Sequence, residues 1–257
     1  MVGQIFHVIL YQPLFNLFIF LYNIIPGHDL GLVIVAVTIL VRLALYPLTS
    51  SGIKAQRALQ DLQPKLAAIK KQYATDTQAQ AQATLEMYKN NKVSPFSSCL
   101  PLLLQLPILI ALYQVLANGI VSTDLSAIVY PFIHNPGTLN PLSFGLVNLA
   151  KPQIILAVLA GAAQYFQAKT LIRKSPPATA GMAGKDENMM AMMNKQMLYF
   201  MPVLTVIIGA RLPAGLTLYW FFSTALMVLQ QHLLGLDSKT SGTTTPPNGV
   251  IEGTIVK

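Results

Sequence analysis

The chain has 257 residues, of which 53% are hydrophobic and 10% are charged. Soluble domains carry about 25% charged residues, so the composition excludes an ordinary soluble protein and predicts an integral membrane protein. The single cysteine, Cys99, excludes an internal disulfide and a cysteine-rich metal site. The net charge of +8 is compatible with nucleic acid binding, but its distribution along the chain points first to membrane topology.

The first 29 residues contain an apolar stretch, residues 4–25, that is interrupted by glutamine, asparagine and proline. Pro26 and Gly27 then form a break signal. No lysine or arginine precedes Arg42, so positive charge does not hold this end in the cytoplasm. We expect residues 1–29 to form an N-terminal extracytoplasmic interfacial helix, with a membrane span as the alternative.

Residues 30–50 form the first predicted span, because about 20 apolar residues suffice to cross a bilayer. Arg42 lies within this run, roughly 18 Å along the helix from Leu30 at about 1.5 Å per residue. A cation at this depth is costly and needs water or a partner. None of the nine acidic residues falls in a candidate span, which leaves water, polar side chains or a ligand. Snorkelling of Arg42 to the lipid phosphates is the simpler alternative.

Residues 51–93 are polar and helix-favouring, with seven basic and three acidic residues. Apolar residues recur at spacings of three and four from Leu59 to Tyr73, which is typical of a coiled-coil seam. A weaker stripe follows at Ala81, Leu85 and Tyr88. We predict a cytoplasmic helical hairpin. It is either simply solvated or a basic arm that contacts ribosomal RNA, a nascent chain or anionic lipid.

Residues 94–117 form the second predicted span, in which two prolines flank Gln105. Residues 118–151 contain three prolines and read as an extracytoplasmic loop. Residues 152–171 form the third span, and its run of alanine and glycine allows close helix packing.

The remaining segments alternate in the same way. Residues 172–195 are a basic cytoplasmic loop, residues 196–211 a short fourth span, and residues 212–235 the fifth span. Residues 236–257 are rich in serine, threonine, glycine and proline and predict a disordered cytoplasmic tail. The positive-inside rule then places the N-terminus outside and the C-terminus in the cytoplasm. The sequence therefore predicts an all-α, polytopic membrane protein.

The motifs of an enzyme are absent from the sequence. The four histidines lie near segment ends or in loops, and no HExxH or GxSxG motif occurs. We expect no catalytic residue, no metal site and no cofactor. A small transporter or channel lacks its usual paired repeats or buried acids but stays an alternative, as does an assembly scaffold. The favoured reading is a site that holds polar parts of another chain inside the bilayer.

Four stretches follow one another in a specific order. They are GLVIVAVTILVRLALYPLT (31–49), LQDLQPKLAAIKKQY (59–73), SPFSSCLPLLLQLPILIALYQ (94–114) and MPVLTVIIGARLPAGLTLYWFFSTALMVLQQ (201–231). Together they resemble the YidC/Oxa1/Alb3 family of membrane protein insertases, in its short bacterial form without a large extracytoplasmic domain. The resemblance implies five transmembrane helices around a hydrophilic groove that is open to the cytoplasm and to lipid.

The resemblance also implies groove residues. Arg42 matches the groove arginine, which attracts acidic parts of the incoming substrate. Gln105 matches the polar position of the CLPLLLQLPI motif, although an interhelical hydrogen bond is its simpler role. Trp220 matches the aromatic residue of the PAGLTLYW motif. Gln164 and Gln167, which share one face of the third span, are added to the substrate groove from their polarity alone.

Seven of the ten methionines fall between residues 182 and 201. Flexible thioethers adapt to varied apolar partners, so Met189, Met193 and Met197 are candidate substrate contacts near the groove mouth. The alternative is an ordinary helix that leads into the fourth span.

These observations together predict a membrane protein insertase and chaperone. We expect it to work as a monomer in the bacterial inner (plasma) membrane on newly made membrane proteins. Membrane lipids surround it, and the Sec translocon and the ribosome are further candidate partners. No nucleotide-binding motif is present. Burial of apolar surface, aided by the membrane potential, must therefore drive insertion.

Overall fold

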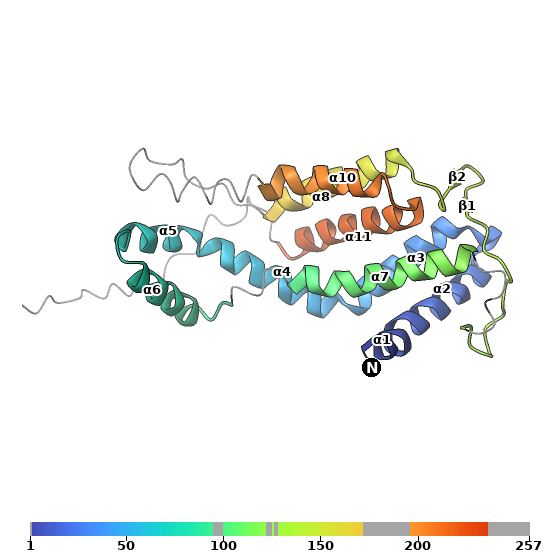
Figure 1. The fold of residues 1–257 in the computed structure, drawn as a ribbon, viewed down its shortest axis with the longest axis horizontal. Coiled ribbons are helices and arrows are strands. Elements are labelled where there is room, and N and C mark those ends of the chain that lie inside the picture. The colour runs from blue at the N-terminus through green and yellow to red at the C-terminus, as the bar shows by residue number, and fades with distance from the viewer. Residues whose placement is uncertain (1, 95–99, 122–124, 126–127, 172–195, 236–257) are drawn as a thin grey trace, which may run out of the picture.

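A computed structural model describes residues 2–94, 100–121, 125, 128–171 and 196–235 of the protein. Most helices run along one long axis, and a smaller helical hairpin extends from one end (Figure 1). We call the opposite end, where α3, α8 and α11 begin, the outer end. The predicted segments 172–195 and 236–257 lie outside the described residues, and so do Met189 and Met193.

The first helix comprises α1 (Val2–Phe6), a π-helical turn (His7–Tyr11) and α2 (Gln12–Ile24). It is continuous because the backbone at both junctions keeps right-handed helical angles. Its most deeply buried apolar side chains recur every three or four residues and are Tyr11, Leu14, Phe15, Phe18, Ile19 and Tyr22. Within the described ranges, Gly3–Ile24 is the one unbroken helix whose length and hydropathy suffice for a membrane span. This helix belongs to the core, and its interfacial position stays a prediction.

Two further helices complete this core. α3 (Leu30–Ala44) and α7 (Leu100–Val121) both pack against α2, and α7 also packs against the π-helical turn. Their buried faces show the same helical spacing: Leu30, Val33, Ile34 and Val37 in α3, and Ile108, Ala111, Leu112, Val115 and Leu116 in α7. α7 continues to Val121, beyond the predicted end of the second span at residue 117.

A second group consists of α8 (Ile154–Leu171), α10 (Met201–Gly209) and α11 (Ala214–Leu233). A π-helical turn, Gln196–Phe200, precedes α10. α8 packs against α10 and α11, and α11 also packs against α3, so that α11 joins the two groups. A side-chain carbon on Gly161 of α8 would lie 2.9 Å from the Pro202 carbonyl oxygen of α10. Glycine there allows the close approach of the two helices.

The predicted first span breaks near its inner end. α3 ends at Ala44, α4 (Tyr46–Asp61) begins two residues later, and the two segments are bent by 70°. Pro47 lies in the first turn of α4, where its fixed backbone angle favours a new helix start. Among the described residues, this bent pair is the second candidate span, and Leu104–Gly119 and Gln196–Gly209 are shorter apolar helices.

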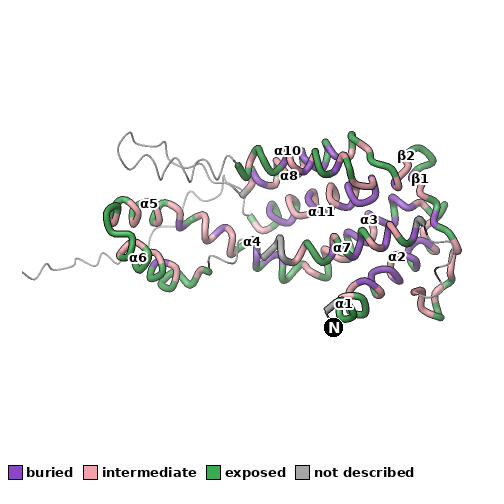
Figure 2. Tube along the Cα trace, viewed as in Figure 1, coloured by how far each residue is buried: buried purple, intermediate pink, exposed green. Residues whose placement is uncertain are grey.

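α5 (Gln63–Gln72) and α6 (Thr77–Asn90) form the helical hairpin and contact each other. The predicted apolar stripe of α6 is wrong. Leu85 is 58% exposed, whereas Met87 is 8% exposed and packs inward. The partner helix sets which face of α6 is buried, and the flexible methionine side chain fits that face. Figure 2 shows that exposed residues cover this hairpin while buried residues gather in the main bundle.

The all-α prediction misses one small element. β1 (Leu142–Ser143) and β2 (Val147–Asn148) pair antiparallel within the predicted outer loop. The turn between them contains Phe144 and Gly145, with φ angles of 51° and 68°. Two successive positive φ angles are typical of the tight hairpin turn that matches strand twist. We call β1, this turn and β2 the outer hairpin.

Candidate functional site

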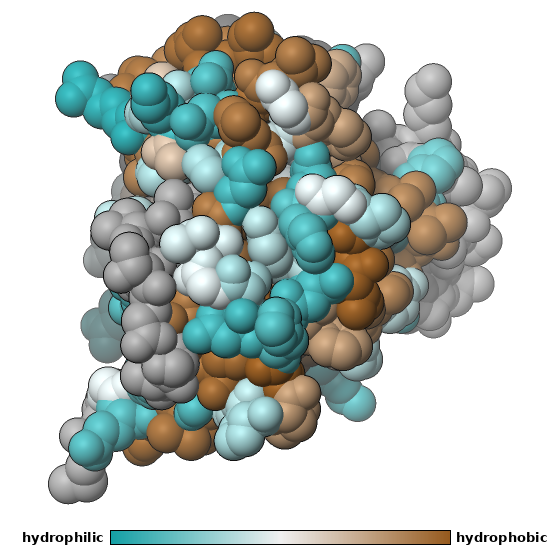
Figure 3. All heavy atoms as spheres, turned by 90° about the vertical axis from the view of Figure 1, so that its right-hand side faces the viewer, coloured by the Kyte–Doolittle hydropathy of each residue, from teal (hydrophilic) through white to brown (hydrophobic). Residues whose placement is uncertain are grey.

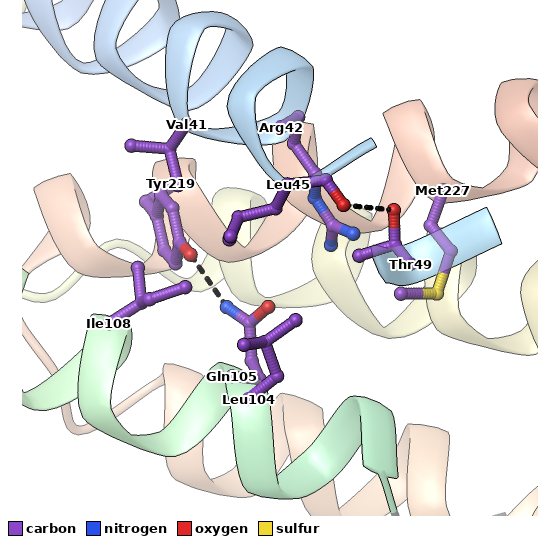
Figure 4. Close-up of a pocket in the computed structure, with 9 residues that line it drawn as sticks. All are labelled: Val41, Arg42, Leu45, Thr49, Leu104, Gln105, Ile108, Tyr219 and Met227. Carbon is purple, nitrogen blue, oxygen red and sulfur yellow. Dashed lines mark hydrogen bonds between the residues drawn. The ribbon is translucent and has the colours of Figure 1, made fainter. Parts of the chain in front are cut away.

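A small cavity lies where α3, α4, α7 and α11 meet. It is lined by Val41, Arg42, Leu45, Thr49, Leu104, Gln105, Ile108, Tyr219 and Met227. The empty space between these side chains amounts to about 300 Å³, including the part that is open to the outside. Figure 4 shows the polar ends of Arg42, Gln105 and Thr49 gathered around this space. The lining joins three separate parts of the chain, namely the consecutive helices α3 and α4, then α7, and then α11.

Arg42 lies in the last turn of α3, and its guanidinium reaches across to α11. Its Nε and Nη2 both donate to the Ser223 hydroxyl, at 3.0 and 2.6 Å. A guanidinium has five N–H donors. Within the described ranges Arg42 has no carboxylate partner, so most of its hydrogen-bonding capacity stays available. This geometry places the cation between two helices and argues against snorkelling along α3.

Gln105 of α7 donates from Nε2 to the Tyr219 hydroxyl of α11 at 2.6 Å. The structure therefore brings the predicted Gln105 into the same cavity as Arg42 (Figure 4). The predicted aromatic residue, Trp220, is half-buried and does not line the cavity, whereas its neighbour Tyr219 does. A one-residue step turns a helix by about 100°, so a motif alone does not tell which of two adjacent aromatic residues faces inward.

Tyr219 was missed, although one sequence signal points to it. Tyr219, Ser223 and Met227 recur at intervals of four residues, a spacing that places them on one face of α11. Tyr219 and Met227 line the cavity, and Ser223 holds Arg42. The polar members of this face identify the side of α11 that meets α3 and α7.

The two glutamines of α8 lie behind the cavity. Gln167 donates from Nε2 to the sulfur of Met227 at 2.8 Å, so it contacts a lining residue from outside. Gln164 accepts a hydrogen bond from the Thr205 hydroxyl and thereby links α8 to α10. Neither glutamine lines the cavity. Met197, in the π-helical turn before α10, is 42% exposed and lies apart from the lining residues.

A second polar cluster follows toward the inner end of α11. Gln230 donates from Nε2 to the hydroxyls of Thr49 and Ser50, at 3.0 and 2.8 Å, and so ties α11 to α4. Gln231 is fully buried, and neither polar atom of its side chain has a hydrogen-bond partner in the described part of the chain. An unsatisfied buried amide costs about 1–3 kcal/mol. The sequence motifs alone assign no role to Gln230 and Gln231.

At the outer end, Asp29 connects the start of α3 to the outer hairpin. Its carboxylate caps α3 by accepting from the Leu32 backbone N–H, and it also accepts from the Ser143 hydroxyl and the Phe144 backbone N–H. Burial alone would raise the pKa of Asp29, but these hydrogen bonds outweigh it and lower the pKa below its ordinary value. A side-chain carbon on Gly31 would collide with the Ser143 hydroxyl, so this close contact requires glycine.

The polar groups of the cavity can form hydrogen bonds with a bound group. These polar lining groups are a guanidinium, a carboxamide and two hydroxyls, all of which donate or accept hydrogen bonds. The lining contains no carboxylate, imidazole or thiol that would act as a base or nucleophile. Among the described residues, no group of three or more histidine, cysteine, aspartate or glutamate side chains is arranged to hold a metal ion.

An apolar helical bundle with a half-buried cation beside a small, mainly apolar cavity is typical of a helical membrane protein. The family model described as 60Kd inner membrane protein matches residues 20–240. The chain belongs to this family, so the resemblance predicted from the sequence motifs is confirmed.

Individual relatives agree with this assignment. The chain is 36% identical over 208 residues to the membrane protein insertase YidC of Fusobacterium nucleatum, which covers 80% of this chain and 86% of that relative. It is 32% identical over 208 residues to the YidC of Clostridium tetani, with 81% of this chain and 82% of the relative covered. It is also 32% identical over 225 residues to the YidC of Tolumonas auensis, where the match covers 87% of this chain but only 35% of the longer relative.

Proposed function

We propose that this protein inserts small membrane proteins into the bacterial inner membrane and assists their folding. Relatives of similar length are named membrane protein insertase YidC, and the family is one of inner membrane proteins. The observation that carries the mechanism is Arg42, a half-buried cation whose partner in the described chain is a single hydroxyl. Such a group is available to a client's polar segment at a depth where the bilayer offers none.

In this mechanism, an acidic or polar client segment enters the cavity from the cytoplasm. Arg42 holds a carboxylate by charge-assisted hydrogen bonds, which are shorter and stronger than neutral ones. Gln105, Tyr219 and Thr49 offer neutral donors and acceptors to the client backbone next to it. The apolar part of the client leaves sideways into lipid, and the burial of its surface supplies the driving free energy. The membrane potential adds to this for negatively charged segments.

The proposed topology has five spans, with the N-terminus outside and the C-terminus in the cytoplasm. The short fourth span supports a thinned bilayer beside the site. Gln196–Gly209 has 14 residues, which is about 21 Å of helix against about 30 Å of hydrocarbon. A thinner bilayer shortens the path that a polar client segment travels from Arg42 to the outer surface.

Partners follow from the same proposal. Clients are newly made membrane proteins, and lipids surround the spans. The cytoplasmic hairpin of α5 and α6 carries lysines on exposed positions and is suited to the ribosome, a nascent chain or anionic lipid. We expect the protein to act as a monomer, with the Sec translocon as a further partner for larger clients.

Reconstitution of the purified protein into liposomes tests this function. A single-span client with an acidic outer segment is added, and its protection from protease is measured. An insertase protects the client with no other protein present. An assembly scaffold would leave the client digestible, and a small transporter or channel would conduct solute without protecting it. Either result would contradict insertion.

A further inference from the structure

The outer hairpin presents two large apolar side chains to its surroundings. Phe144 is 71% exposed and Leu146 is 86% exposed, although each is bulky and hydrophobic. Both belong to a turn of fixed shape, since the Leu146 backbone N–H donates to the Ser143 carbonyl oxygen at 3.0 Å. An exposed apolar pair on a rigid turn indicates a surface that contacts something apolar.

The hairpin is held in this position at some conformational cost. Phe144 has a φ of 51°, in a region that side chains other than glycine rarely adopt. Asp29 maintains it by accepting hydrogen bonds from the Phe144 backbone N–H and the Ser143 hydroxyl. The Leu149 backbone N–H also donates to the Pro141 carbonyl oxygen at 2.8 Å and closes the base. The surrounding hydrogen bonds therefore fix the direction in which Phe144 and Leu146 project.

Lipid is the partner that the neighbouring surface favours. The chain passes from β2 into α8 within a few residues, and the first turns of α8 expose Ile154, Ile155 and Val158 at 59%, 71% and 51%. In a membrane protein such a surface faces acyl chains. Seen end on, hydrophilic side chains run from the upper left edge across the middle of the outer end, and hydrophobic side chains lie above them and to their right (Figure 3). This end therefore presents apolar side chains at part of its edge, where surrounding lipid can reach them.

The outer end also carries two exposed cations in addition to its exposed apolar side chains. Lys151 and Arg211 are both exposed. The Ala214 backbone N–H donates to the Lys151 carbonyl oxygen at 3.0 Å, which brings the segment that begins at Arg211 close to Lys151. Apolar side chains beside lysine or arginine are typical of segments that lie in the membrane interface, with the cations at the phosphates.

We propose that the outer hairpin is an interfacial anchor: Phe144 and Leu146 insert into the headgroup region of the outer leaflet, and Lys151 and Arg211 bind lipid phosphates. The anchor fixes the height at which the outer ends of α3, α8 and α11 sit in the bilayer. It depends on the membrane location of the chain and not on insertion activity, so it can fail or hold independently of the proposed function.

An environment-sensitive label on the hairpin tests the anchor. In a Cys99→Ser background, Leu146→Cys is labelled with the fluorophore NBD in the full-length protein and reconstituted into liposomes of phosphatidylglycerol and phosphatidylethanolamine. Leu146 is so exposed that its replacement removes few contacts. Thr138→Cys, an exposed polar position in the same outer loop, is the matched control. Phe144→Cys is a second label position on the turn.

If the anchor is correct, labels at positions 146 and 144 should show blue-shifted emission and should be quenched by lipids that carry a nitroxide near the headgroup. Iodide in solution should quench them much less than it quenches the label at position 138. Adding Asp29→Ala should move the emission at 146 back toward that of 138. Equal iodide quenching at 146 and 138 would overturn the proposal. A blue shift that lipid nitroxides do not quench and that vanishes on dilution with lipid would also overturn it, because it would show contact between two copies of the chain.

Discussion

The outer end and the cavity handle their polar groups in opposite ways. At the outer end, Asn16 bonds with both sides of its carboxamide, to the carbonyl oxygens of Gln12 and Ile128 and to the Tyr130 backbone N–H. Asp29 likewise accepts three donors. In and below the cavity, Arg42 has one hydroxyl partner and Gln231 has none in the described chain. The satisfied groups stabilise the fold, the unpaired amide of Gln231 is fully buried and should destabilise it, and only the half-buried Arg42 fits the proposed role in binding a client.

Replacing Arg42 should give the largest functional effect. Arg42→Met removes a half-buried cation without a counter-ion, so the melting temperature in detergent should stay the same or rise. Insertion of a client with an acidic segment should fall by roughly tenfold to a hundredfold, as expected for hydrogen bonds to a charged group worth about 1.5–3 kcal/mol. Protection of the client from protease in liposomes measures this insertion. Lys54→Met, an exposed cation on α4, is the control and should insert normally. Normal insertion by Arg42→Met would remove this residue from the mechanism.

At the outer end, a substitution should lower stability and leave insertion unchanged. Asp29→Ala removes a helix cap and two hydrogen bonds to the outer hairpin, which should lower stability by about 1–2 kcal/mol. Insertion measured below the lowered melting temperature should be unchanged. Thermal unfolding and protease protection together separate the two effects. A loss of insertion without a loss of stability would show that the outer end takes part in client transfer.

The contribution of Asp29 also has a defined pH dependence. Its pKa is lower in the folded protein than its ordinary value of about 3.9, so the carboxylate stabilises the fold above that value. This stability is lost as the pH falls through the folded pKa. The difference in melting temperature between the native chain and Asp29→Ala should therefore be constant near neutral pH and shrink below about pH 4. A difference that grows on acidification would contradict the assigned hydrogen bonds.

The neighbouring glutamines of α11 should respond with opposite signs. Gln231→Leu removes an unsatisfied buried amide and should raise stability by about 1 kcal/mol. Gln230→Leu breaks the hydrogen bonds to Thr49 and Ser50 and should lower stability by a similar amount. Melting temperatures of the two variants provide the comparison. If Gln231→Leu is the more destabilising change, Gln231 belongs to a structural network and not to the unsatisfied part of the site.

The smallest expected effect concerns the link between α7 and α11. Tyr219→Phe removes the hydroxyl that accepts from Gln105, at a cost of about 0.5–1.5 kcal/mol. A double-mutant cycle of Tyr219→Phe with Gln105→Leu should show coupling. The matched cycle of Trp220→Phe with Gln105→Leu should show none, because Trp220 does not line the cavity. Equal coupling in both cycles would contradict a specific hydrogen bond between Gln105 and Tyr219, because it would show that the coupling comes from packing alone.

Helical periodicity predicted much of the fold, because side chains at three- and four-residue spacing must share one face. It anticipated that residues 51–93 fold as a helical hairpin, which α5 and α6 form. It did not anticipate the outer hairpin, whose turn has positive φ at Phe144 and depends on Asp29, a residue 115 positions away. Long-range hydrogen bonds of this kind leave no local pattern.

The site was predicted in part for the same reason. Arg42 and Gln105 stand out because a polar residue in an apolar run is costly, and both line the cavity. Polarity alone does not tell which neighbour a glutamine faces. Gln164 and Gln167 do not line the cavity: Gln164 accepts a hydrogen bond from Thr205, and Gln167 donates one to the sulfur of Met227. Tyr219 was missed in favour of Trp220, since the motif does not specify which side of α11 faces α7.

A charge cycle between the cavity and a client tests the central claim most directly. Insertion of one client with an acidic outer segment, and of the same client with each acid changed to its amide, is measured for the native chain and for Arg42→Met. If Arg42 binds the client's carboxylates, the variant should insert the acidic client far less well than the native chain and the neutral client about equally well. An equal loss for both clients, or for neither, would contradict a role for Arg42 in binding client charge.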